Sequence, residues 1–169
     1  MIQIELSRED PWPEGDWEAL AVRAARAAIE RTPHGPLLDT PALVEISVRL
    51  AADDEVRHLN HQYRHKDKPT NVLSFPMVQP DLIQSVSLNS DDGELLLGDI
   101  VLAHGVCVAE AAERGISTEA HATHLLVHGT LHLLGYDHLE DGEAEAMEEI
   151  ERQALETLGI ADPYLIREE

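Results

Sequence analysis

The chain has 169 residues, a length sufficient to bury a sizeable core. Its composition, 43% hydrophobic and 27% charged residues, is ordinary for a soluble protein. Its formal net charge of −21 repels polyanions over a long range, and composition alone therefore argues against a nucleic-acid partner. The single cysteine, Cys107, excludes an internal disulfide, and no stretch approaches the roughly 18 consecutive apolar residues of a membrane span, so we expect a soluble cytoplasmic protein with no membrane contact.

The first 50 residues alternate between strand and helix patterns. Apolar and polar residues alternate from Ile2 to Leu6, which is typical of a short strand, and an Ala- and Arg-rich segment predicts a helix from Trp17 to about Arg31. Three prolines and a glycine predict a loop over residues 32–41. Alternation resumes from Leu43 to Leu50 and predicts a strand with one buried face.

The middle of the chain begins with a helix for which Asp53 is a candidate N-cap. A β-rich segment follows from Asn71 to Met77, and because Pro76 has no N–H group, this strand must lie at a sheet edge or end there. Residues 79–94 are polar and predict a loop, and residues 95–102 form the next candidate strand.

Three helices are expected in the remainder of the chain. The first follows Ala103, buries Cys107 and is closed by Gly115. The second can be capped by Ser117, runs to about Leu134 and stops at Gly135, and an acidic amphipathic helix covers residues 143–158. These patterns predict a single α+β domain over residues 1–169, with four strands and about five helices.

The helix that ends at Gly135 carries the motif HGTLHLLGYDH over residues 128–138. His128 and His132 are four residues apart, so their rings lie on one helical face about 6 Å apart and can bind one cation. Glycine at position 135 can reverse the chain and bring His138 back as a third ligand. Three imidazoles and a water are typical of an open catalytic Zn²⁺ site, so the sequence predicts one zinc ion per chain.

The same offsets occur in the metzincin peptidase motif HExxHxxGxxH, but Gly129 stands where that motif has glutamate. In a zinc peptidase the glutamate takes a proton from the metal-bound water and passes it to the leaving amine, and glycine can do neither. Phosphodiester cleavage depends more on stabilising negative charge, which a metal and an arginine can supply. A peptidase is therefore the weakest alternative.

Two residues beside the motif are candidates to orient a ligand ring from the second coordination shell. His124 lies one helical turn before His128, and Asp137 directly precedes the third histidine. The alternatives for His124 are a partly exposed side chain and a metal ligand paired with His128, although a site built on that pair leaves His132 unexplained. The alternative for Asp137 is a turn or cap residue.

A basic cluster contains Arg64 and both lysines of the chain, Lys66 and Lys68. The alternative interpretation is a solvated helix end whose cations complement the helix dipole. Beside a metal site, however, the three cations are candidates to bind an anionic substrate, because local potential can attract phosphate even when the net charge is negative.

Three blocks of the chain resemble a known family. The segments LNHQYRHKDKPTNVLSFP (residues 59–76), LLLGDIVLA (residues 95–103) and HGTLHLLGYDH stand in the order and spacing of the YbeY proteins, bacterial single-strand-specific endoribonucleases of ribosomal RNA maturation. The resemblance implies an α+β fold with a small mixed sheet and helices packed around it.

The resemblance also implies roles for individual residues. His128, His132 and His138 would be the zinc ligands, and Arg64 would contact RNA phosphate. The family resemblance further implies processing of the 3′ end of 16S rRNA, ribosome quality control, and ribosomal proteins and an Era-like GTPase as partners; DNA is not an expected substrate.

Two functions from different classes follow. The first is a zinc-dependent hydrolase that cuts single-stranded RNA, with the general base left open among the metal hydroxide, Asp137, His124 and an RNA 2′-hydroxyl. The second is a ribosome-assembly factor in which zinc holds the fold and RNA cutting is incidental. The catalytic set of the first hypothesis is Arg64, His128, His132 and His138.

Overall fold

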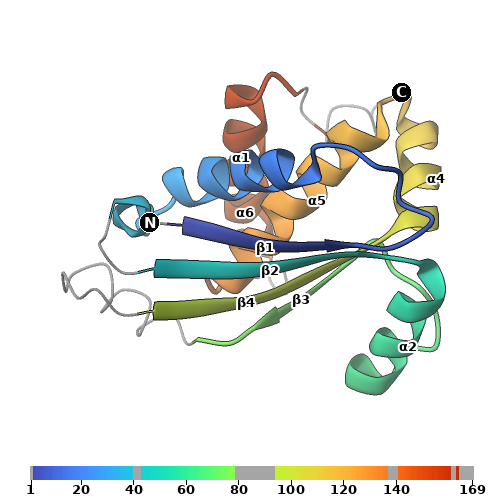
Figure 1. The fold of residues 1–169 in the computed structure, drawn as a ribbon. Coiled ribbons are helices and arrows are strands. Elements are labelled where there is room, and N and C mark those ends of the chain that lie inside the picture. Colours follow the sequence, from blue (N-terminus) through green and yellow to red (C-terminus); the bar gives the residue numbers. More distant parts are fainter. Residues whose placement is uncertain (1, 40–42, 79–93, 137–140, 161–162, 164–169) are drawn as a thin grey trace.

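The computed structural model describes residues 2–39, 43–78, 94–136, 141–160 and 163. Within these ranges, four strands form one mixed sheet in the order β1-β2-β4-β3 (Figure 1). Strands β1, β2 and β4 run parallel, and β3 is antiparallel to β4. The strand bounds are Ile2–Arg8 for β1, Leu43–Ala51 for β2, Val72–Pro76 for β3 and Glu94–Ala103 for β4.

The five predicted helices are confirmed, with bounds within about two residues of those expected. Helices α1 and α5 pack on one face of the sheet and α6 lies over both of them, whereas α2 lies at one end of the opposite face (Figure 1). The bounds are Trp17–Glu30 for α1, Asp53–Arg64 for α2, His104–Arg114 for α4, Thr118–Leu133 for α5 and Asp141–Thr157 for α6. The α+β class is confirmed.

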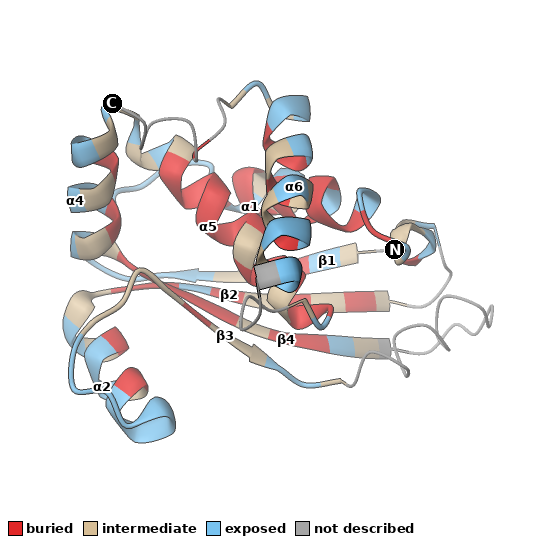
Figure 2. Cartoon of the chain, turned by 180° about the vertical axis from the view of Figure 1, so that it is seen from behind, coloured by how far each residue is buried: buried red, intermediate tan, exposed pale blue. Residues whose placement is uncertain are grey.

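The main core lies between the sheet and helices α1, α5 and α6 (Figure 2). Alternate side chains of β2, from Val44 to Leu50, are at most 2% exposed, which confirms the predicted strand with one buried face. A smaller core lies under α2, where Val56 packs with Leu73 and Val101 on the other face of the sheet. Both faces of the C-terminal part of β4 are therefore covered.

The prediction that Asp53 caps its own helix was wrong. Helix α2 follows Ala52, which has no capping side chain. The Asp53 carboxylate instead accepts hydrogen bonds from the backbone N–H groups of Gly105 (2.8 Å) and Val106 (3.3 Å), in the first turn of α4. A carboxylate satisfies orphan donors at any helix N-terminus that the fold brings near it, so this acid joins α2 to α4.

Three smaller predictions have different outcomes. The predicted loop over residues 32–41 contains a short 3-10 helix, Gly35–Leu38. The predicted loop over residues 79–94 lies outside the described residues, except for Glu94 in β4. Cys107 is buried as expected, and burial raises the pKa of its thiol to about 12.

None of the described helices is long and apolar enough to cross a membrane.

Candidate active site between β3 and α5

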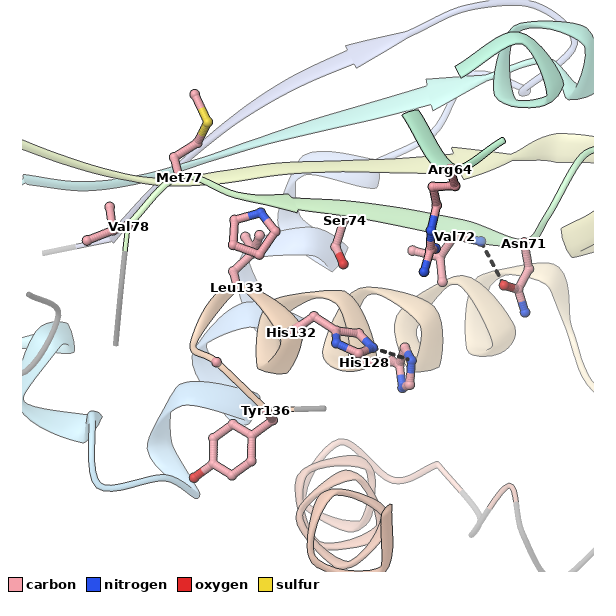
Figure 3. Close-up of a pocket in the computed structure, with 12 residues that line it drawn as sticks. Arg64, Asn71, Val72, Ser74, Met77, Val78, His128, His132, Leu133 and Tyr136 are labelled. Atoms are coloured by element: carbon pink, nitrogen blue, oxygen red, sulfur yellow. Dashed lines mark hydrogen bonds between the residues drawn. The ribbon is translucent and has the colours of Figure 1, made fainter. Parts of the chain in front are cut away.

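A cleft of about 680 Å³ lies between edge strand β3 and helix α5 (Figure 3). Its described lining comes from the end of α2, from β3 and the residues on either side of it, and from the C-terminal part of α5 with the turn that follows. The lining contains Arg64, His128 and His132, and no aspartate or glutamate is among its described residues. Because the described lining carries a cation and no carboxylate, this cleft is suited to an anion even though the chain as a whole has a net charge of −21.

The two histidines of the cleft point their Nε2 atoms at each other. His128 and His132 lie one turn apart on α5, and the two Nε2 atoms are 3.1 Å apart. Two imidazole nitrogens that bind one zinc ion at 2.0–2.1 Å in tetrahedral geometry are about 3.3 Å apart. The pair therefore fits two positions of a zinc site without rearrangement of α5.

A buried carboxylate on α6 orients His128, one member of this pair. Glu151 of α6 is 1% exposed, and its Oε1 atom accepts hydrogen bonds from His124 Nε2 (2.8 Å) and from His128 Nδ1 (3.3 Å). Because the Nδ1–H group of His128 donates a hydrogen bond to the carboxylate, the neutral ring has its lone pair on Nε2, which faces the cleft. This is the tautomer that binds a metal.

The charge state of Glu151 follows from two opposing effects. Burial by itself raises the pKa of the carboxyl group, but hydrogen bonds from His124 and His128 outweigh burial and bring the pKa down to about 2. The carboxylate is therefore ionised at neutral pH and accepts both hydrogen bonds. Because the rings of His124 and His128 both donate hydrogen bonds to this buried carboxylate, their orientations are fixed.

Glu151 was not among the residues predicted from the sequence. A signal was nevertheless present, because α6 buries Met147, Ala154 and Leu155, and Glu151 lies on the same helical face. An acid at a core-facing position of an amphipathic helix requires a buried partner. The sequence alone does not say which residue that partner is.

Gly129 lies against the sheet and does not line the cleft. A Cβ atom at this position would meet side-chain atoms of Ile100 on β4 at 3.1–3.3 Å. Close packing of α5 on β4 therefore requires the glycine that stands where the peptidase motif has glutamate. A longer side chain at position 129 would be forced into the sheet and away from the histidines.

We expect Gly129→Glu to lower the free energy of unfolding by more than about 3 kcal/mol, because it overpacks the interface with Ile100 and buries a carboxylate without a partner, and to confer no peptidase activity. Gly142→Glu is the matched control, since nothing lies within 4 Å of a Cβ atom at that position in the first turn of α6. Denaturant unfolding measures both variants. Equal stabilities would contradict the packing explanation.

The structure separates the members of the predicted basic cluster. Arg64 is the last residue of α2 and extends toward the histidines in the cleft (Figure 3). His65 adopts a left-handed conformation, with φ of 60°, and ends the helix. Lys66 and Lys68 follow this turn, are exposed, and do not line the cleft.

The third predicted ligand, His138, follows the end of α5 in the sequence. Helix α5 ends as predicted, with Gly135 at φ of 103° and hydrogen bonds from Gly135 N–H to His132 O and from Tyr136 N–H to Leu131 O. His138 and Asp137 lie outside the described residues. Within the described part of the chain, no group of three or more His, Cys, Asp or Glu side chains could hold a metal ion.

The fold and the site together define an α+β protein in which one helix carries two imidazoles with adjacent Nε2 atoms. An arginine lines the same cleft, at the edge of a mixed sheet. A family model described as Endoribonuclease YbeY matches residues 7–159, and the chain belongs to this family.

Individual relatives agree with this assignment. The chain is 64% identical to Endoribonuclease YbeY of Rhizorhabdus wittichii over the full length of both chains. It is 56% identical to Endoribonuclease YbeY of Sphingopyxis alaskensis, covering 97% of this chain and 98% of that protein. The solution structure of TM1509 from Thermotoga maritima is similar, with a TM-score of 0.52 and 25% identity, covering 96% of this chain and 98% of that one.

Proposed function

We propose that the chain is a zinc-dependent endoribonuclease that cuts single-stranded RNA. The observation that carries this proposal is the cleft itself, in which Arg64 lies beside two convergent imidazole nitrogens and no acid is among the described lining residues. The names of the relatives, Endoribonuclease YbeY, support an RNA substrate. The local charge of the cleft answers the objection raised by the net charge of the whole chain.

The proposal assigns a role to each candidate residue of the site. His128 and His132 would bind the zinc ion through Nε2, together with His138, and Glu151 holds the ring of His128 in the required tautomer. A zinc ion held there would supply Lewis-acid polarisation and activation of water. Arg64 would bind the phosphate and stabilise its developing negative charge.

The geometry argues against a peptidase of the HExxH type. Position 129 faces Ile100 of the sheet, so no side chain there can serve the cleft as a proton shuttle.

The assembly-factor alternative differs from the enzyme in one respect that can be measured: it needs zinc for stability and not for cutting. Family resemblance further supports a cytoplasmic role in maturation of the 16S rRNA 3′ end and in ribosome quality control, with ribosomal proteins and an Era-like GTPase as partners.

We expect chelation to abolish cleavage of a single-stranded RNA without unfolding the protein, because the described core does not depend on the histidine pair. Zinc added back at one equivalent per chain should restore cleavage, and a fully base-paired RNA of the same sequence should remain intact. Product gels and thermal unfolding with and without chelator measure both effects. Metal-loaded protein that cuts no RNA, and loses only stability on chelation, would favour the assembly factor.

A further inference from the structure

Strand β3 is a sheet edge, and its register shows which main-chain groups point away from β4 to the free edge. Met77 N–H donates to Leu97 O (2.9 Å), and Ala103 N–H donates to Asn71 O (3.1 Å), so the odd-numbered residues of this segment pair with β4. In an antiparallel ladder, alternate residues point their N–H and C=O groups away from the partner strand. The even-numbered residues of β3 therefore present these groups at the free edge.

Three residues of β3 are even-numbered, and only one of them offers an open donor. Val72 N–H donates to the side-chain oxygen of Asn71 (2.7 Å), and Pro76 has no N–H group. Ser74 N–H remains, and no acceptor for it is found among the described residues.

The side chain of Ser74 lines the cleft, and its N–H group lies at the free edge of the same strand. Ser74 pairs with Ile100, whose side chain packs on α5, so the Ser74 side chain also lies on the α5 side of the sheet. Ser74 lines the cleft, and its hydroxyl and the Arg64 side chain both extend toward the histidine-bearing helix (Figure 3). One residue thus adds two neutral donors opposite the imidazole pair.

We infer that Ser74 is a substrate-binding residue whose main-chain N–H and hydroxyl donate hydrogen bonds to a non-bridging oxygen of an RNA phosphodiester. This inference rests on the proposed function and names a further contact of the same site. An anionic oxygen is the matching ligand, because the described lining offers Arg64 and uncharged donors and no carboxylate.

The same edge is unsuited to an added peptide strand. Strand addition requires a donor at every second residue of the edge, whereas the donors at Val72 and Pro76 are occupied and absent, respectively. A single donor between them can serve a point ligand such as a phosphate oxygen. The edge therefore distinguishes this cleft from that of a peptidase that binds its substrate as an extra strand.

Two substitutions separate the two donors. Ser74→Ala removes the hydroxyl alone, and Ser74→Pro removes the N–H group as well, at an edge position equivalent to that of Pro76. With zinc-loaded protein and a single-stranded RNA, we expect kcat/KM to fall about 3- to 10-fold for Ser74→Ala and about 10- to 100-fold for Ser74→Pro, with unchanged zinc affinity and Tm.

A second measurement does not depend on the proline variant folding. In ¹⁵N-labelled, zinc-free wild-type protein, addition of single-stranded RNA should move the amide proton of Ser74 downfield and leave that of Val72, which donates to Asn71, in place. If the Ser74 amide stays in place while the Arg64 side-chain signal shifts, or if a folded Ser74→Pro variant keeps wild-type kcat/KM, the inference is wrong and the proposed function stands. If the wild type cuts no RNA, the proposed function fails and this inference fails with it.

Discussion

Arg64→Ala is expected to lower kcat/KM for single-stranded RNA about 100- to 1,000-fold while leaving zinc affinity and Tm unchanged. Arg64 is the only arginine or lysine among the described residues that line the cleft, so its loss leaves the phosphate without a permanent cation. Removing one preorganised donor from a developing oxyanion costs about 2.7–4 kcal/mol of transition-state stabilisation. The side chain is exposed at the end of α2, so stability should change by no more than about 0.5 kcal/mol.

Arg57→Ala is the matched control for this prediction. Arg57 lies on the same helix and is also exposed, but its guanidinium pairs with Asp67 and does not line the cleft. Cleavage rates at several salt concentrations should show a slope reduced by about one phosphate contact for Arg64→Ala and unchanged for Arg57→Ala. Similar losses in the two variants would mean that general charge, and not the position of Arg64, attracts the RNA.

The basic cluster illustrates how far a local pattern predicts a site. Three cations within five residues suggested one phosphate-binding surface, but α2 ends between the first and the second of them. The left-handed His65 turns the chain, so Arg64 lines the cleft while the two lysines do not. Sequence spacing predicts proximity only as far as the helix continues, so the three cations are close in the chain but do not line one cleft. RNA binding by Lys66 and Lys68 stays a prediction.

Periodicity predicted the elements well, because each depends on neighbours in the chain. Ser117 caps α5 through its hydroxyl and the N–H of Ala120 (3.1 Å), and Gly135 ends it, as their residue types indicate. The contacts that complete the site join distant segments: Glu151 reaches His128 across 23 residues, and Ser74 gains its role from the register of β3 against β4. Local sequence carries no record of such pairings.

Glu151→Gln is expected to raise the Kd for zinc about 10- to 100-fold. The substitution keeps the shape of the side chain but removes the negative charge that His128 Nδ1–H faces at 3.3 Å, so the ring loses basicity at Nε2 and part of its orientation. Excess zinc should recover most of the cleavage rate, because no group that contacts the RNA has changed. Competition with a chelating dye measures the affinity directly, independently of RNA cleavage.

Glu149→Gln provides the comparison on the same helix. Glu149 is exposed and pairs with Arg152 and Gln153 on the outer surface of α6, so its loss should leave zinc affinity unchanged. An unchanged zinc affinity in Glu151→Gln as well would show that the carboxylate serves only the packing of α6 on α5. A selective loss would mean that α6, outside the histidine motif, determines how tightly that motif binds metal, because its one buried acid among the described residues fixes the ring that must present Nε2.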